Sequence, residues 1–131
     1  MLTIKDFIAH MKTKYPETTF YNSTLDSSSD KCVGIYSRTA PRIQAVGEPS
    51  SHAVLSVSIL VHWTQDSSMC EDFALSLYNT LISTVRELTP GGVTILFVEP
   101  VDGRPVWSGR DSRNVAEYVI RANIYYERGV S

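Results

Sequence analysis

The chain has 131 residues, a length typical of a single domain that can bury its own hydrophobic core. It is 43% hydrophobic and 20% charged, with a formal net charge of −2, as in ordinary globular proteins. This balance argues against extensive disorder, against binding to anionic membranes and against more than weak contact with DNA. The N-terminus lacks the pattern of a signal peptide, and no apolar run reaches the roughly 20 residues of a membrane span.

The first element is predicted to be a helix that starts after Thr3 and ends before Pro16. Thr3 can cap this helix, and Asp6 adds negative charge near its positive end. Four apolar residues at helical spacing form one stripe: Ile4, Phe7, Ile8 and Met11. Tyr15 ends the pattern, because a residue before proline disfavours helical backbone angles.

The next segments are typical of β-strands. Two short strands, 18–25 and 31–38, flank the polar stretch 26–30, so we expect a β-hairpin. A loop with two prolines and a glycine follows at 39–52, and residues 53–64 form the clearest strand of the chain. Alternate side chains of that strand share one apolar face: Leu55, Val57, Ile59, Val61 and Trp63.

A second helix is predicted from a capping box that begins at Ser68 to the helix-breaking sequence Pro90-Gly91-Gly92. Its apolar stripe consists of Cys70, Phe73, Ala74, Leu77, Leu81, Val85 and Leu88. A strand at 93–99, a loop at 100–113 and a last strand at 114–127 complete the chain. We therefore expect a single α+β domain over residues 1–131, with one mixed or antiparallel β-sheet of four to five strands covered by two α-helices.

The two long loops are the strongest candidates for function. Both exceed the usual connection of about 4–6 residues, and loops of such length tend to be functional. They carry half of the eight arginines: Arg42, Arg104, Arg110 and Arg113. Arginine and tryptophan are enriched at protein interfaces, which makes Trp107 in the second loop a candidate contact residue. The alternative for Trp107 is that it packs back over the edge of the sheet.

No motif in the sequence indicates catalysis, a cofactor or a metal. Cys32 and Cys70 lack metal-ligand spacing and are expected to be buried thiols. His62 and Asp66 could meet at the end of a strand, but Asp66 is better explained as a turn or cap residue. Asp111 lies among arginines and could bind an anion, yet no nucleophile or general base accompanies it. A solvated or interface loop is the favoured interpretation, and we do not expect an enzyme.

Three stretches together resemble a known family: TIKDFIAHMKTKYPETTFYN, SVSILVHWTQDSSMCEDFALSLYNTL and VWSGRDSRNVAEYVIRANIYYER. The matching motifs are the strand end at 61–64, the Gly-Arg-Asp loop at 109–111 and the aromatic pair before Glu-Arg at 124–128. In this order and spacing they resemble small minor capsid proteins of tailed bacteriophages. These proteins are similar in size and element order to tail terminator and tail-completion proteins of long, non-contractile tails.

The resemblance implies a structural protein of the virion, at the tail or the head–tail junction, that assembles in the cytoplasm of the host bacterium. It implies a ring of identical subunits, commonly six, that caps the head-proximal end of the tail tube. The implied partners are other copies of the chain, the tail tube protein and a head-completion or connector protein. The family offers no catalytic residues, cofactor or metal, and contact with DNA in the lumen would be weak at most.

A ring needs head-to-tail contacts between unlike surfaces of neighbouring subunits. We expect these contacts from the two long loops and from the exposed face of the last strand. The candidate interface residues are Arg42, Arg104, Trp107, Arg110, Asp111, Arg113, Arg121, Tyr125 and Glu127. Replacing Arg110 or Asp111 with Ala is expected to leave folding intact and to weaken assembly.

Two other classes of protein stay open at this stage. One is a small cytosolic ferredoxin-like domain that binds a ligand or catalyses a reaction, with a pocket near His62, Asp66 and Arg113. The other is a regulatory subunit that pairs through its sheet edge. A tight small-molecule ligand on a monomer would favour the first, and a stable dimer would favour the second.

Overall fold

The computed structural model describes residues 1–26, 28–39 and 52–127. Arg42 and most of the predicted loop at 39–52 therefore lie outside the described residues. The elements in chain order are α1 (Ile4–Lys14), β1 (Thr19–Asn22), β2 (Cys32–Ser37), β3 (His52–His62), α2 (Ser67–Ile82), β4 (Val85–Leu88), β5 (Thr94–Pro100), β6 (Val106–Arg110) and β7 (Ala116–Glu127). Neither described helix is long and apolar enough to cross a bilayer.

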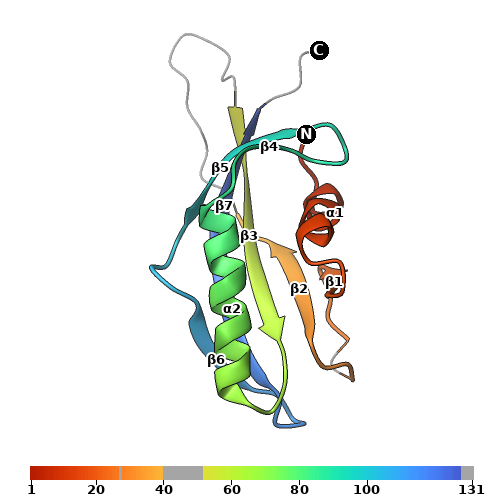
Figure 1. The fold of residues 1–131 in the computed structure, drawn as a ribbon, viewed down its shortest axis with the longest axis vertical. Coiled ribbons are helices and arrows are strands. Elements are labelled where there is room, and N and C mark those ends of the chain that lie inside the picture. Colours follow the sequence, from red (N-terminus) through yellow and green to blue (C-terminus); the bar gives the residue numbers. More distant parts are fainter. Residues whose placement is uncertain (27, 40–51, 128–131) are drawn as a thin grey trace.

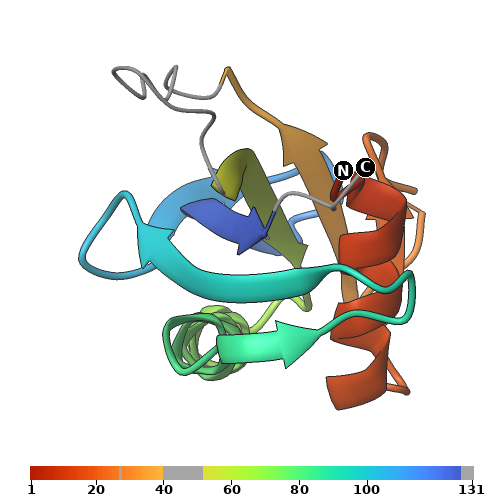
Figure 2. The same ribbon diagram turned by 90° about the horizontal axis from the view of Figure 1, so that it is seen from above.

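One seven-stranded sheet dominates the fold, in the order β1-β2-β3-β7-β5-β4, with β6 paired to β7 beside β5. The long strands β3 and β7 form its centre, and the sheet curls so that β4 and β1 lie at the two ends of a half-barrel (Figures 1 and 2). The expected α+β domain with four to five strands covered by two helices is therefore wrong. The chain is mainly β-structure, and its two helices pack inside the curl.

Helix α2 is shorter than its sequence pattern predicts. It ends at Ile82, and the residues up to Leu88 form strand β4 instead of further helical turns. Pro90-Gly91-Gly92 forms the turn of the β4–β5 hairpin, closed by the Thr89 amide donating to the carbonyl of Val93 (2.8 Å). The sequence predicted a longer helix because Val85 and Leu88 keep the helical spacing of the apolar stripe. This spacing does not exclude a short strand.

The start of α2 also differs from the expectation. Asp66, and not Ser68, is the N-cap, since its side chain accepts from the amides of Ser68 (2.9 Å) and Met69 (3.3 Å). The interpretation of Asp66 as a cap residue is confirmed. At the first helix, Thr3 accepts from the amide of Asp6 (3.1 Å), so that predicted cap is confirmed as well.

Strands β1 and β2 are parallel, so the predicted hairpin is wrong. The chain leaves β1 at Ser23, which adopts φ +59°, and then crosses the face of β2 before it returns. A Cβ atom at Gly34 would lie only 3.0 Å from the carbonyl oxygen of Thr24, so glycine permits this crossing. A polar stretch is compatible with a hairpin turn and with a connection between parallel strands. Composition alone therefore does not distinguish the two arrangements.

Part of the predicted loop at 100–113 is strand β6, which pairs with the first half of β7. The register shifts between Trp107 and Gly109, where Gly109 adopts φ +114° and forms a bulge. Pairing continues past the bulge to Arg110, opposite Ala116, and the chain then turns through residues 111–115. Short strands of this kind carry too few alternating residues to be distinguished from a loop in the sequence.

The core lies between the helices and the facing side of the sheet. The predicted alternation of β3 and β7 is confirmed, since Val57, Ile59 and Val61 are buried with alternate residues of β7. Helix α1 contributes Phe7 and Met11 to this core. The indole ring of Trp63 stacks on Phe73 (centroids 3.8 Å apart), which joins the end of β3 to α2.

Helix α1 also connects the two ends of the curled sheet. It packs on β1 and β2, and His10 and Lys14 contact the carboxylate of Glu87 on β4 (2.8 and 2.5 Å). Burial alone would raise the pKa of the Glu87 carboxyl, but the hydrogen bonds from Lys14 and His10 outweigh it and lower the pKa. Among the described strands, β1 and β4 at the two ends of the sheet do not pair with each other. Helix α1 contacts both of them.

Candidate interaction surfaces

The loop between β6 and β7 is organised by Asp111. Its Oδ1 atom accepts hydrogen bonds from the backbone amides of Val115 and Arg113, both at 2.9 Å. The hydrogen bond from Val115 is the largest cause that lowers the pKa of the Asp111 carboxyl. Only 15% of its side chain is exposed. Asp111 therefore stabilises the loop from within, and its predicted role in assembly stays a prediction.

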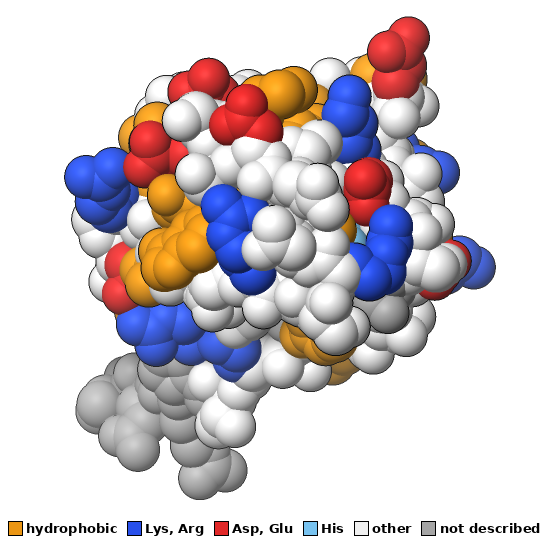
Figure 3. Space-filling view, turned by 90° about the horizontal axis from the view of Figure 1, so that it is seen from below, with side chains coloured by type: hydrophobic (Ala, Val, Ile, Leu, Met, Phe, Trp, Pro, Cys, Tyr) orange, Lys and Arg blue, Asp and Glu red, His pale blue; other side chains and the backbone are white. Residues whose placement is uncertain are grey.

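The neighbouring arginines tie this loop to other connections of the chain. Arg110 donates from Nη1 to the carbonyls of Gln65 (2.8 Å) and Asn114 (3.0 Å). Arg113 donates from Nη2 to the carboxylate of Asp30 at 3.3 Å. The loops that follow β1, β3 and β6 therefore meet at one end of the molecule, which Figure 3 shows with several Lys and Arg side chains at its surface.

His62 lies directly beneath this loop. It is fully buried, its Nδ1 atom lies 2.9 Å from Glu117 Oε2, and its Nε2 atom lies 3.6 Å from Asp111 Oδ2. His62 thus meets two carboxylates and not Asp66, which caps α2. Because His62 is inaccessible, it does not line the surface pocket that the ferredoxin-like alternative requires. Among the described residues, no cluster of three or more His, Cys, Asp or Glu side chains is arranged so that it could hold a metal ion.

Strand β6 presents a mixed apolar and cationic edge. Trp107 packs edge-on against Tyr118 (centroids 5.3 Å apart), yet 45% of it remains exposed. The guanidinium of Arg110 lies 5.7 Å from the centre of the indole ring. Val106 is similarly exposed, and Arg104 contacts Glu71 of α2 at 3.5 Å. We call Arg104, Val106, Trp107 and Arg110 the β6 edge.

The interpretation that Trp107 packs back on the sheet is confirmed in part, and its role as a contact residue stays a prediction. The ring does fold back onto the sheet through Tyr118, and it also leaves a large apolar surface facing outward. Tyr118 is itself fixed, because its hydroxyl donates to Glu71 Oε2 at 3.1 Å. Through Tyr118 the side chain of Trp107 is held in place before any partner binds, and this reduces the conformational entropy lost when a contact forms.

A second exposed apolar surface lies on the side of the sheet that faces away from the helices. Cross-strand pairing places Val85 of β4 beside Phe97 of β5, Phe97 beside Tyr125 of β7, and Tyr125 beside Val54 of β3. The rings of Phe97 and Tyr125 stack with centroids 4.6 Å apart. We call these four residues the apolar row.

Of the predicted interface residues, Tyr125 belongs to this row and Glu127 lies next to it. Glu127 contacts Arg86 of β4 at 3.8 Å. Arg121 lies farther along β7 and forms a two-point contact with Asp102 (2.9 and 2.7 Å), which lowers the pKa of the Asp102 carboxyl. The sequence prediction of an exposed face on the last strand identified this side of the sheet, but it missed Val85 and Phe97.

One signal in the sequence could have identified Phe97. The strand Thr94–Pro100 reads TILFVEP, and Phe97 lies two residues before Glu99, so alternation places it on the same face as that charged residue. Val85 offered no such signal, because its spacing also fitted the end of a helix. The tertiary arrangement alone brings it beside Phe97.

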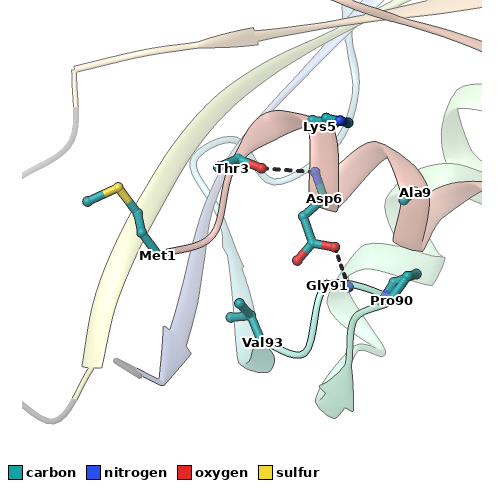
Figure 4. A pocket seen from close by; sticks show the side chains of 8 residues that line it. All are labelled: Met1, Thr3, Lys5, Asp6, Ala9, Pro90, Gly91 and Val93. Carbon is teal, nitrogen blue, oxygen red and sulfur yellow. Dashed lines mark hydrogen bonds between the residues drawn. The ribbon is translucent and has the colours of Figure 1, made fainter. Parts of the chain in front are cut away.

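A shallow depression of about 430 Å³ lies between α1 and the β4–β5 turn (Figure 4). Its polar groups already bind one another: Asp6 accepts from the amide of Gly91 (2.8 Å) and from the hydroxyl of Thr89 (2.5 Å). A Cβ atom at position 91 would lie 2.6 Å from the carboxylate carbon of Asp6. The depression therefore marks the attachment of the hairpin to α1.

The fold and these surfaces describe a structural module. Its polar side chains hold its own loops and strands together, while two separate apolar surfaces face outward.

A family model described as bacteriophage tail terminator protein matches residues 7–128. The chain belongs to this family, as the resemblance of its sequence implied, and it is a structural component of the virion. No curated protein matches the chain.

Proposed function

We propose that the chain is the subunit of a homo-oligomeric ring that caps the head-proximal end of the tail tube. The ring, commonly of six copies in such proteins, would stop tube growth and present its other face to a head-completion or connector protein. Membership of the tail terminator family over residues 7–128 carries this proposal.

The surfaces of the subunit support a ring. A closed ring is built from head-to-tail contacts, which require two unlike patches on every subunit. The apolar row and the β6 edge are two such patches, and they differ in charge, since the row has no charged side chain and the β6 edge has two arginines. A two-fold dimer would need only one patch that complements itself.

Hydrogen bonds within the subunit hold the chain beside the β6 edge. Arg110, Asp111 and Arg113 fix the loop beside the β6 edge through hydrogen bonds within the subunit. A preformed surface binds with a smaller loss of conformational entropy than a mobile loop. These residues would therefore support assembly by positioning the edge, in addition to any direct contact that they make.

Loss of the chain from the phage tests the proposal. In its absence we expect tail tubes that grow beyond their normal length and filled heads that remain unjoined, both measured in electron micrographs. Resupplying the purified chain to unjoined heads and tails should restore infectious particles. Tails of normal length, joined to heads without the chain, would contradict both the capping and the joining role.

A further inference from the structure

Between the sheet and the β6–β7 loop lies a buried histidine whose two ring nitrogens each face a carboxylate. We propose that a proton on His62 ties this loop to the sheet, and that the loop loosens when His62 becomes neutral. The inference concerns the single subunit and goes beyond the proposed ring. We call Asp111, His62 and Glu117 the His62 cluster.

The cluster joins two strands and a loop. His62 ends β3, and its partner across the strand pair is Glu117 of β7, so both side chains lie on the same face of the sheet. The Nδ1 atom of His62 lies 2.9 Å from Glu117 Oε2, and its Nε2 atom lies 3.6 Å from Asp111 Oδ2. The histidine is fully buried and both carboxylates are largely buried, so solvent and salt screen these contacts little.

A neutral imidazole cannot satisfy both carboxylates. It carries a hydrogen on one ring nitrogen and a lone pair on the other. If Nδ1 donates to Glu117, the lone pair of Nε2 faces the carboxylate of Asp111, and two buried acceptors oppose each other. Among the described residues, neither His62 Nε2 nor Asp111 Oδ2 has a hydrogen-bond partner. The site thus lacks one hydrogen, and a second proton on the ring supplies it.

The charges of the cluster favour the same proton. Asp111 and Glu117 place two negative charges beside a neutral ring, whereas an imidazolium compensates one of them. A distance of 3.6 Å is too long for a hydrogen bond, but opposite charges still attract each other across it. The proton does not settle on Asp111, because hydrogen bonds from the amides of Val115 and Arg113 lower the pKa of that carboxyl.

Other titratable or charged groups lie near the cluster, on β2, in the β6–β7 loop and in the connection between β1 and β2. They are Cys32, Tyr36, Arg110, Arg113, Asp26 and Asp30. Burial raises the pKa of the Cys32 thiol to about 11 and also raises the pKa of Tyr36, so both stay neutral near pH 7. Arg113 contacts Asp30 at 3.3 Å. Histidine is the one type of side chain in this set that ordinarily changes charge near neutral pH.

Asp111 transmits the charge of His62 to the loop. Its Oδ1 atom accepts from the amides of Arg113 and Val115, while its Oδ2 atom faces His62. The attraction is present while the proton is bound, and it is lost as the pH rises through the titration of His62 in the folded chain. The amides of Arg113 and Val115 should then open more often. The loop also binds Arg110 through the carbonyl of Asn114 (3.0 Å), so its order extends to the β6 edge.

Hydrogen exchange of the loop, compared with the titration of His62, tests the inference. NMR of isotope-labelled imidazoles reports which ring nitrogens carry hydrogen, and mass spectrometry reports amide exchange of residues 111–116, both from about pH 5 to 9. Each exchange rate is divided by the intrinsic rate at that pH, and residues 56–60 of β3 serve as the internal reference. As His62 loses its second proton, protection of residues 111–116 should fall at least about fivefold, and that of β3 should not change.

Three variants separate the proton from the other contacts of the loop. In Asp111→Asn the side-chain oxygen still accepts from the backbone amides, and the side-chain nitrogen donates to the bare Nε2 atom. Its protection should therefore no longer fall as His62 becomes neutral. His62→Asn has no titrating ring and should lose the dependence on pH. His10→Asn is the control, because it removes another buried histidine, on α1, and should keep the dependence. Thermal unfolding would verify that the variants fold.

The contrary results are specific. Protection of the loop that stays constant while His62 titrates, or that changes to the same extent in Asp111→Asn, overturns the inference. An imidazole whose hydrogens do not change between about pH 5 and 9 overturns it as well. None of these measurements requires a ring or a tail tube, so their failure leaves the proposed function in place.

Discussion

Replacing His62 with Phe should destabilise the fold at neutral pH, and the effect should shrink in acid. His62 is fully buried, and its Nδ1 atom lies 2.9 Å from Glu117 Oε2. Phenylalanine fills a similar volume but has no polar atom, so the Glu117 carboxylate loses its hydrogen-bond partner, and Asp111 loses the imidazole nitrogen that lies 3.6 Å from its Oδ2 atom. Hydrogen bonds to charged groups contribute about 1.5–3 kcal/mol, and breaking one side of a buried pair costs about 3–5 kcal/mol.

Since the carboxylate of Glu117 is partly exposed, we expect a loss of about 2–4 kcal/mol in the free energy of unfolding. Acid neutralises both carboxyls, which removes the penalty in the variant. In the unaltered chain the lowered pKa of Asp111 means that its contribution is present above its ordinary value of 3.8 and is lost as the pH falls further. The difference between the two proteins should therefore persist from pH 7 to about pH 4 and narrow as the pH falls further.

Urea unfolding at a series of pH values measures this difference. His62→Asn is the matched control, because its amide can still donate near the former Nδ1 position and should recover part of the stability. Equal unfolding free energies of His62→Phe and the unaltered chain at pH 7 would refute the reasoning. A difference that does not narrow in acid would show that lost packing, and not the carboxylates, is the cause.

Three further predictions concern other parts of the chain. Glu87→Gln should lower stability at neutral pH but not well below pH 4.5, because the lowered pKa of Glu87 makes its contribution vanish in acid; urea unfolding at both pH values checks this. Gly91→Ala should cost about 1–2 kcal/mol by displacing the turn from Asp6, and the cost should disappear in an Asp6→Ala background, as a double-mutant cycle would show. Cys32 and Cys70 should react with a thiol reagent only as fast as the protein unfolds, because burial raises the pKa of both thiols to about 11; labelling rates with and without urea test this.

The contacts of Asp111 also change how its predicted role in assembly must be tested. Its carboxylate holds two backbone amides, so Asp111→Ala alters the loop as well as any contact with a neighbour. A loss of assembly in that variant would therefore not identify a direct contact. Trp107→Asp is the more direct test, since this ring is nearly half exposed and accepts no backbone hydrogen bond that holds the described loop.

The sequence by itself determined the elements that are long and strongly patterned. Helix α1 and its Thr3 cap, strand β3, strand β7 and the alternation of their side chains follow from periodicity, because one face of each element must be buried. The sequence also indicated the family, because several short motifs in a fixed order are specific together although none is specific alone. The alternation of the last strand predicted its exposed face as well as its buried face.

Only the tertiary structure decided the rest. Strands β4 and β6 are four and five residues long, and they exist because β5 and β7 offer them unpaired backbone groups. The parallel pairing of β1 with β2 depends on a chain crossing that Gly34 permits, a contact between segments that no local pattern encodes. The apolar row likewise joins residues from four strands, so its members become neighbours only when the sheet forms.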